Sequence, residues 1–351
     1  KEAEKAKQLL ESEQAADAEE AAKAMVQGIQ RAAPNAITQL CPLADGGEGS
    51  LDALIAATHA ERRTLTVQDA LGRPRQAAWG WLSEQRTAFI ELAEASGLQH
   101  LTREERNALH TTTFGVGELF LAALDAGATH ALLLLGGSAT NDAGAGMLQA
   151  LGATLLDAQG QPLPLGGAAL QQLATLDLST LDPRLAELRV EAAVDVDNPL
   201  LGERGASAVF GPQKGATDAD VATLDRALGH FADLTAKALG RDDRELPGAG
   251  AAGGMGFAAH CFLNATLTPG IEMIMQQANF AQLLNDADLV ITGEGRLDGQ
   301  SLAGKTPIGV SRAANRQGKP VIVLAGSLGD GWQACTEEGV TAAFALADGL
   351  M

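Results

Sequence analysis

The pattern of apolar and polar residues predicts buried strands that alternate with helices. His130–Leu135 is apolar without alternation after its first residue, which is typical of a parallel strand covered on both faces. Three segments near the end of the chain have the same character, namely Asp288–Thr292, Pro320–Ala325 and Ala342–Leu346. Helical patterns separate them. This order predicts an α/β fold with a mostly parallel sheet.

Other segments fill in this fold. The opening, Lys1–Ala33, is rich in helix formers and should be helical up to Pro34. Alternating runs on either side of Leu-Gly-Arg-Pro, at 62–67 and 75–82, predict a β-hairpin. The remaining predicted strands are Ile37–Cys41, Thr87–Leu92 and Arg189–Val196, and the remaining predicted helices begin near Gly49 or span Phe114–Gly127, Ala143–Ala153, Asp218–Leu239, Gly248–Leu263 and Glu272–Leu284.

A polar, glycine-rich loop follows the strand that ends at Leu135. Two glycines permit a tight turn, and Asn141 or Asp142 is placed to cap the next helix. Backbone N–H groups and a helix dipole at such a junction favour a bound anion. The loop fits neither the P-loop pattern nor a clean G-x-G-x-x-G, and a turn used only for packing is the alternative. The candidates for nucleotide or phosphate binding are Gly136, Gly137, Ser138, Thr140, Asn141 and Asp142.

Charge and composition narrow the classes of function. A chain of 351 residues suggests about two domains. The formal net charge of −19 argues against nucleic acid and anionic membranes as partners and leaves small molecules. Cys41, Cys261 and Cys335 form no C-x-x-C pair, which favours reduced thiols in the cytoplasm. No apolar stretch is long enough to cross a membrane, and the chain does not open like a signal peptide.

Four further loops mix glycine with charged residues and are expected to join a strand to a helix. Ligands of open α/β sheets bind outside the carboxyl ends of the strands. Acidic, glycine-rich loops that meet there suggest phosphoryl transfer assisted by Mg²⁺. An acidic residue of this kind, taken alone, is more often a helix cap or turn residue, but five such loops in one chain favour a function. These loops are Ala44–Gly49, Asp195–Pro199, Phe210–Gly215 and Thr292–Asp298.

Three residues are candidates for catalysis. Asp195 and Asp197 share a face if the strand before them continues, so that one could accept the proton of a substrate hydroxyl while the other serves a metal. Turn capping before Pro199 is the alternative. Lys214 lies between glycines, which suits a mobile phosphate contact; simple solvent exposure is the alternative.

Charged residues in the outer loops are candidates for substrate and metal binding. Arg296, with Lys305 beyond it, is the best candidate to grip a substrate carboxylate. A surface ion pair with Glu294 or Asp298 is the alternative for Arg296. Asp45 and Glu48 of the first loop are assigned to the substrate. Glu294 is assigned, with Asp195, to a metal.

Seven motifs together resemble the class I glycerate kinases. They occur in the family order and span essentially Ala21–Leu346, which is far more specific than any one glycine loop. The motifs are ADGGEG, TTTFGVGEL, GGSATND-x-GAGM, DVDNPLLG, ASAVFGPQKGAT, PGAGAAGGMG and VITGEGRLDGQSLAGKTPIGV.

The resemblance implies an enzyme that uses ATP and Mg²⁺ to phosphorylate D-glycerate at the 2-hydroxyl. It also implies two α/β domains with the active site in the cleft between them, one of the domains being discontinuous. We place residues 1–64 and 286–351 in the discontinuous domain and 65–285 in the inserted one. Which loop takes nucleotide and which takes glycerate is left open, as is assembly into a homo-oligomer.

The chain departs from the family at both ends. Family members open with an apolar strand and a loop that contributes polar groups to the cleft, whereas this chain opens with a helical pattern, and its end is shorter. We expect Glu2–Leu10 to be helical and to pack Leu9 and Leu10 on the discontinuous domain. The alternative function is therefore a kinase-fold protein that binds nucleotide or other anions with little or no turnover.

Overall fold

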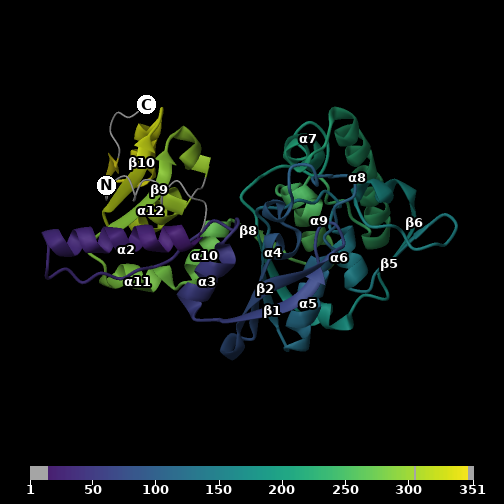
Figure 1. Cartoon of the computed structure of the whole chain (residues 1–351), viewed down its shortest axis with the longest axis horizontal. Helices are drawn as coiled ribbons and strands as arrows, with labels where there is room; N and C mark the ends of the chain where they lie inside the picture. Colours follow the sequence, from purple (N-terminus) through teal and green to yellow (C-terminus); the bar gives the residue numbers. More distant parts are fainter. Residues whose placement is uncertain (1–14, 304–305, 347–351) are drawn as a thin grey trace. The chain divides into compact units, whose positions relative to one another are not determined.

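The computed structural model describes residues 15–303 and 306–346. The predicted helix at Glu2–Leu10 lies outside these residues. The chain divides into two compact units (Figure 1): unit 1 joins the residues up to His59 to those from Pro269 onward, and unit 2 is Ala60–Thr268. Compared with the domain boundaries expected from the sequence, residues 60–64 fall in unit 2 and residues 269–285 in unit 1.

Unit 2 is built on a six-stranded sheet with the order β1-β2-β3-β4-β7-β8. The hairpin of β1 and β2 is antiparallel, as the alternating pattern predicts, and β2 pairs with β3 in the same way. From β3 onward the strands are parallel. The strands are β1 (Glu61–Gln68), β2 (Pro74–Leu82), β3 (Thr87–Glu91), β4 (His130–Leu134), β7 (Arg189–Ala193) and β8 (Thr266–Thr268).

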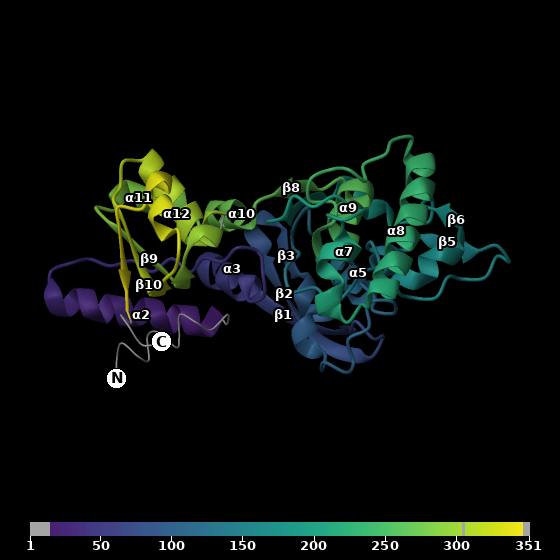
Figure 2. The ribbon, with the colours of Figure 1, turned by 90° about the horizontal axis from the view of Figure 1, so that it is seen from above.

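Helices cover this sheet, and a separate hairpin stands at the rim of the unit. The helix α5 packs on β1 and β3, and α9 packs on β7. The hairpin of β5 (Thr154–Asp157) and β6 (Leu173–Asp177) projects from the end of unit 2 in both ribbon views (Figures 1 and 2). The helices of unit 2 are α4 (Leu92–Ser96), α5 (Phe114–Asp125), α6 (Ala145–Ala150), α7 (Ala206–Phe210), α8 (Asp218–Leu239) and α9 (Ala251–Leu263).

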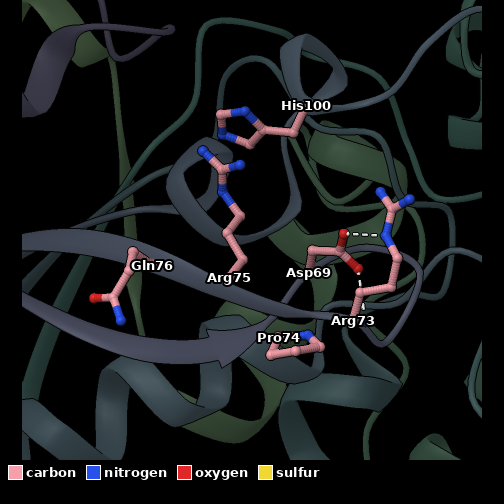
Figure 3. Close-up of a pocket in the computed structure, with 6 residues that line it drawn as sticks. All are labelled: Asp69, Arg73, Pro74, Arg75, Gln76 and His100. Carbon is pink, nitrogen blue, oxygen red and sulfur yellow. Dashed lines mark hydrogen bonds and ion pairs between the residues drawn. The ribbon is translucent and has the colours of Figure 1, made fainter.

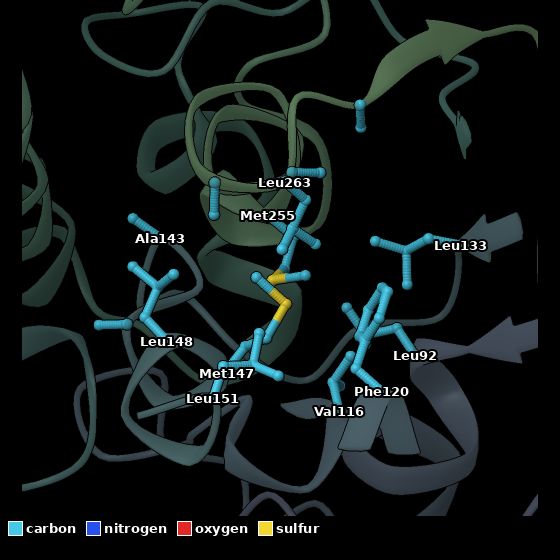
Figure 4. Packing of buried hydrophobic residues seen from close by; sticks show 14 of the residues in the cluster. Leu92, Val116, Phe120, Leu133, Ala143, Met147, Leu148, Leu151, Met255 and Leu263 are labelled. Atoms are coloured by element: carbon cyan, nitrogen blue, oxygen red, sulfur yellow. The ribbon is translucent and has the colours of Figure 1, made fainter. Parts of the chain in front are cut away.

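The core of unit 2 lies between β4 and the helices α5, α6 and α9. In Figure 4, Phe120 of α5 lies beside Leu133 of β4, and both are fully buried. Met147 of α6 and Met255 of α9 both lie close to Gly144, which precedes α6. These helices thus bury both sides of the loop that joins β4 to α6.

Unit 1 contains a three-stranded parallel sheet with the order β11-β10-β9. The helix α12 packs on β9 and β10 (Figure 1), and its apolar residues join a core separate from that of unit 2. The strands are β9 (Val290–Leu297), β10 (Val321–Leu328) and β11 (Ala342–Ala345), and the helices are α2 (Ala15–Ala32), α3 (Ser50–Thr58), α10 (Gly270–Gln277), α11 (Phe280–Asp286) and α12 (Thr306–Arg316).

Several predicted elements differ from the structure. Residues 37–41 are not a strand, and Ile37 is 99% exposed. An apolar run makes a strand only where a neighbouring strand supplies hydrogen bonds, and no strand pairs with residues 37–41 within the described part of the chain. The helix predicted at Glu272–Leu284 is two helices, because Asn279 adopts a left-handed conformation with φ of 53°. The strand predicted at Asp288–Thr292 instead runs from Val290 to Leu297.

Glycine permits a close approach between α5 and α6. A Cβ atom on Gly117 would lie 2.6 Å from both the Ala150 Cβ and the Met147 carbonyl oxygen. Gly117→Ala should therefore lower the free energy of unfolding of unit 2 by about 1–3 kcal/mol, since a packed core resists added volume.

Gly229→Ala is the matched control. It lies in α8, where the added Cβ would meet only an ordinary contact 3.5 Å away, and it should stabilise the unit by up to about 1 kcal/mol. Urea unfolding followed by tryptophan fluorescence measures both. Equal effects of the two substitutions would contradict close packing at Gly117.

Candidate functional site

The loop after β4 has an exposed part and a buried part. Gly136 is half-buried and Gly137 is exposed, with a left-handed φ of 72° at Gly137. The four polar candidates that follow are all buried, at 0–5% exposure. The two glycines are therefore the solvent-accessible part of the loop, whereas the polar side chains are buried. These four residues are Ser138, Thr140, Asn141 and Asp142.

The Asp142 carboxylate ties the loop to two helices. It accepts hydrogen bonds from the backbone N–H of Thr113 at 2.9 Å and from the Thr113 hydroxyl at 2.9 Å. It also accepts from the N–H groups of Gly144 at 3.1 Å and Gly146 at 3.2 Å. Burial raises the pKa of Asp142, and these donors oppose the rise by favouring the charged form. Asp142 thus joins the first residues of α5 and α6 to the loop.

Lys214 approaches the same loop from the other side. It is 2% exposed, so it is neither the mobile contact nor the solvent-exposed side chain considered from the sequence. Its Nζ donates to the Thr140 carbonyl at 2.6 Å and lies 3.4 Å from the Ser138 Oγ. Burial lowers the pKa of Lys214 to about 7, against the opposing charge of Asp142.

Asn141 is buried with half of its amide unsatisfied. Its Nδ2 donates to the Ser207 hydroxyl at 2.9 Å, whereas its Oδ1 is buried without a hydrogen-bond partner among the described residues. The roles of Thr113 and Ser207 were not predicted from the sequence. Thr113 does stand in the TTTFGVGEL motif, which was the available signal.

A glycine-rich segment at the start of α9 packs against the loop. Ala252, Gly253 and Gly254 have left-handed backbone angles. A Cβ on Gly253 would lie 2.0 Å from the Thr140 carbonyl oxygen, so only glycine allows this approach. The Gly253 carbonyl also accepts a hydrogen bond from the Ala143 N–H at 3.0 Å. The low-complexity run seen in the sequence is therefore a packing surface for the loop.

Asp195 lies just beyond the end of β7. Its side chain is exposed, and the preceding Val194 N–H donates to the Thr268 carbonyl at 2.9 Å, which continues the pairing with β8. Asp197 is exposed and pairs with Arg204, with Nη2 3.0 Å from both carboxylate oxygens.

The loop of Asp195 and the loop of Gly136 pack on the same segment. The Asn198 carbonyl accepts a hydrogen bond from the Gly250 N–H at 2.9 Å, a few residues before the contact of Gly253 with Ala143. The segment at 250–254 therefore links the two loops within unit 2.

The candidates of unit 1 form local contacts of their own. Asp45 accepts from the Gly47 N–H at 3.2 Å, and Glu48 is exposed. Glu294 accepts from the Ser301 hydroxyl at 2.9 Å. Arg296 is exposed, and its Nε lies 3.1 Å from Asp298. This is one of the ion pairs considered from the sequence. Lys305 lies outside the described residues.

The expected plan of strand, loop and helix is wrong for three of the five loops. Residues 44–49 follow an irregular segment rather than a strand. Residues 210–215 follow the short helix α7. Most of residues 292–298 belongs to β9 itself. Only the loops after β4 and β7 leave the carboxyl end of a strand.

Carboxylates are not clustered in the described part of the chain. Among those residues, no group of three or more His, Cys, Asp or Glu side chains is placed to hold a metal ion. In the same residues, no helix has both the length and the apolar character of a membrane span.

The arrangement in unit 2 defines a class of protein. A glycine-rich loop leaves the carboxyl end of a parallel strand, and a buried lysine and a buried carboxylate hold it from behind. In α/β proteins this edge of the sheet is where ligands bind. The fold and the loop are those of an α/β protein whose glycine-rich loop stands at the edge of the sheet where such proteins bind ligands.

Comparisons with known proteins agree with this class. The model of the glycerate kinase family matches residues 12–351. The chain is 48% identical to a glycerate kinase of Halalkalibacterium halodurans, covering 95% of this chain and 87% of the relative. It is 48% identical to the glycerate 2-kinase of Escherichia coli strain K12, covering 94% and 86%. The crystal structure of a putative glycerate kinase 2 from Salmonella typhimurium LT2 matches with a TM-score of 0.85 and 48% identity, covering 93% and 86%.

The chain therefore belongs to the glycerate kinase family. It is accordingly an enzyme of the kinase class, which transfers phosphate to an alcohol group. The resemblance inferred from the sequence motifs is confirmed, as is the α/β fold with a mostly parallel sheet.

Burial of Lys214 predicts a pH dependence of stability. The pKa of Lys214 in the folded protein, about 7, lies below its ordinary value of 10.5. The unfolded chain therefore binds more protons than the folded one between these values. Stability relative to a Lys214→Met variant should rise with pH across that window, by at most about 1.4 kcal/mol per pH unit.

Urea unfolding at a series of pH values measures this difference. Lys237→Met is the control, because Lys237 is an exposed lysine on α8. Parallel stability curves for wild type and Lys214→Met would show that Lys214 titrates normally and would refute the burial argument.

Proposed function

We propose that this protein uses ATP to phosphorylate D-glycerate at the 2-hydroxyl, giving 2-phospho-D-glycerate. The observation that carries the proposal is the contact of Lys214 with the loop after β4, in a chain of the glycerate kinase family. That contact brings a buried cationic group to the glycine-rich loop in a protein of net charge −19. Relatives named glycerate kinase and glycerate 2-kinase support the substrate and the position.

The loop after β4 is our candidate for the phosphates of the nucleotide. Gly136 and Gly137 lie at its accessible end, and Ser138 lies directly behind them. Backbone N–H groups of such a loop can hold phosphate oxygens without a side chain in the way. Thr140, Asn141 and Asp142 are buried, so we assign them the role of fixing the loop rather than touching the nucleotide.

Asp195 is our candidate for the base. In the reaction the 2-hydroxyl oxygen of glycerate forms a bond to the γ-phosphorus, the bond from that phosphorus to the bridging oxygen breaks, and ADP leaves. The hydroxyl proton passes to the Asp195 carboxylate. Asp195 suits this role because its side chain is exposed while its backbone follows a paired strand. Asp197, the other candidate, pairs with Arg204.

Mg²⁺ is part of the proposal as the partner of ATP. Bound with the nucleotide, it would neutralise charge on the phosphates. Magnesium in kinases is commonly held by one or two carboxylates together with phosphate oxygens and water. The exposed Asp195 can therefore serve such a site without a cluster of acids, and Glu294 is the second candidate ligand.

The residues of unit 1 are our candidates for glycerate. Arg296 presents an exposed guanidinium that can form two parallel bonds to a carboxylate, and Asp45 and Glu48 can accept hydrogen bonds from the substrate hydroxyls. A cytoplasmic location, where thiols stay reduced, belongs to the same proposal, since Cys41, Cys261 and Cys335 are free.

The direct test is release of ADP from ATP with and without D-glycerate, with the position of the phosphate identified by ³¹P NMR. Turnover that depends on D-glycerate and yields 2-phospho-D-glycerate supports the proposal. ATP binding without such turnover would support instead the kinase-fold protein with little activity. No observation among the described residues favours that alternative.

Asp195→Asn tests the base. The substitution keeps the shape and removes the basicity, so kcat should fall by about two to four powers of ten while the affinity for nucleotide changes little. Asp197→Asn is the matched control and should lose much less activity. A near-normal kcat for Asp195→Asn would move the role to Asp197 or Asp45.

Arg296→Lys tests the grip on the substrate carboxylate. It keeps the positive charge but loses the planar fork of donors, so the KM for D-glycerate should rise about tenfold or more with the KM for ATP unchanged. Steady-state kinetics with each substrate varied in turn separates the two constants. An unchanged KM for D-glycerate would leave Arg296 as the surface ion pair with Asp298.

A further inference from the structure

A polar hollow lies in unit 2, beside the hairpin of β1 and β2. Figure 3 shows its side chains, with the Arg75 guanidinium next to the His100 ring and the Asp69–Arg73 pair to one side. Its volume is about 570 Å³, which is ample for a small metabolite. The residues that line it are Asp69, Arg73, Pro74, Arg75, Gln76 and His100.

Asp69 contributes a carboxylate to the lining of the hollow, and both of its oxygens already accept hydrogen bonds. Asp69 accepts hydrogen bonds from the Leu71 N–H at 2.8 Å and the Arg73 N–H at 2.9 Å through one oxygen. Its other oxygen lies 2.7 Å from the Arg73 Nε. Arg73 in turn also pairs with Glu105 at 2.6 Å. Asp69 and Glu105 thus both pair with Arg73, and neither of them forms an ion pair with Arg75.

Arg75 is fixed in place with its outer nitrogens unoccupied. Its Nε donates to the Glu94 carbonyl at 3.0 Å, and within the described residues no carboxylate forms an ion pair with it. An arginine anchored through Nε holds its two terminal amino groups as a ready fork for carboxylate or phosphate oxygens.

His100 faces Arg75 and has an orphaned ring nitrogen. Its Nε2 is buried without a hydrogen-bond partner among the described residues. Burial and the neighbouring Arg75 lower the pKa of His100 to about 4, and the Ala93 carbonyl and the charge of Asp69 oppose this. Without an anion the ring is therefore neutral at pH 7.

We propose that this hollow binds a small anion through a phosphate or carboxylate group, gripped by the fork of Arg75 and by His100 donating from Nε2. The anion supplies an ion-pair partner for Arg75 and a hydrogen-bond partner for His100 Nε2. His100 gains a proton when the anion binds, because a negative charge beside the ring favours the imidazolium. Binding is therefore tighter at lower pH. The site lies on the hairpin side of unit 2 and involves none of the residues assigned to phosphoryl transfer.

Calorimetric titration of the full chain, without nucleotide, tests the site. Sulfate is the first probe, because its charge is constant across the mildly acidic to neutral range. Arg75→Gln should weaken its binding at least about tenfold, as expected for loss of a charged hydrogen-bonding group. Arg75→Lys, which keeps the charge, should lie between. Arg226→Gln removes an equal charge from the exposed face of α8 and should bind as wild type does.

NMR of the His100 ring supplies the second readout. Saturating sulfate should raise the pKa of His100, and His100→Gln should remove the pH dependence of binding while the protein stays folded. Repeating the titration with inorganic phosphate, D-glycerate and 2-phospho-D-glycerate then shows whether the site selects phosphate or carboxylate. Binding that is unchanged in Arg75→Gln, an unmoved His100 resonance, or no binding by any of these anions would overturn the proposal. These outcomes do not depend on whether the protein phosphorylates glycerate.

Discussion

The buried carboxylate of Asp142 is the interaction on which the rest of unit 2 depends. It gathers donors from the start of α5, from the turn before α6 and from α6 itself. An unpaired carboxylate in such a place would be costly, and one surrounded by donors fixes their positions. The loop after β4 therefore cannot change shape without breaking several hydrogen bonds at once. Asp142 is therefore one source of the rigidity of this loop.

Glycines at the start of α9 also hold the loop after β4 in place. Gly253 and Gly254 bring the backbone of α9 against Thr140 and Ala143, at distances that no Cβ would permit. Lys214 also holds the loop, because its Nζ donates a hydrogen bond to the Thr140 carbonyl. The polar residues of the loop are thus enclosed by α5, α9 and the Lys214 segment, and only its two glycines stay accessible. This division explains why a stretch so polar in sequence is so buried in the structure.

The sequence predicts the periodic elements and the family better than the details of the site. The unbroken apolar run of β4 and the alternation of the β1–β2 hairpin are local patterns that indicate strands directly, so both elements are predicted correctly. Ile37–Cys41 shows the limit, since a strand needs a neighbour that its own residues do not specify. The burial of Lys214 is equally invisible in sequence, because glycines on both sides suggest exposure. It results from contacts with a loop more than seventy residues earlier in the chain.

Burial also changes what Lys214 can do for a ligand. Because removal from water disfavours its charged form, the ammonium is poised near neutrality and its proton is held loosely. An anion arriving at Gly136 and Gly137 would favour the charged form, and by reciprocity the charged form would favour the anion. A surface lysine, already fully charged, would offer no such coupling and would be screened by salt. In a chain of net charge −19, Lys214 would thus gain its charge where such an anion binds rather than on the acidic surface.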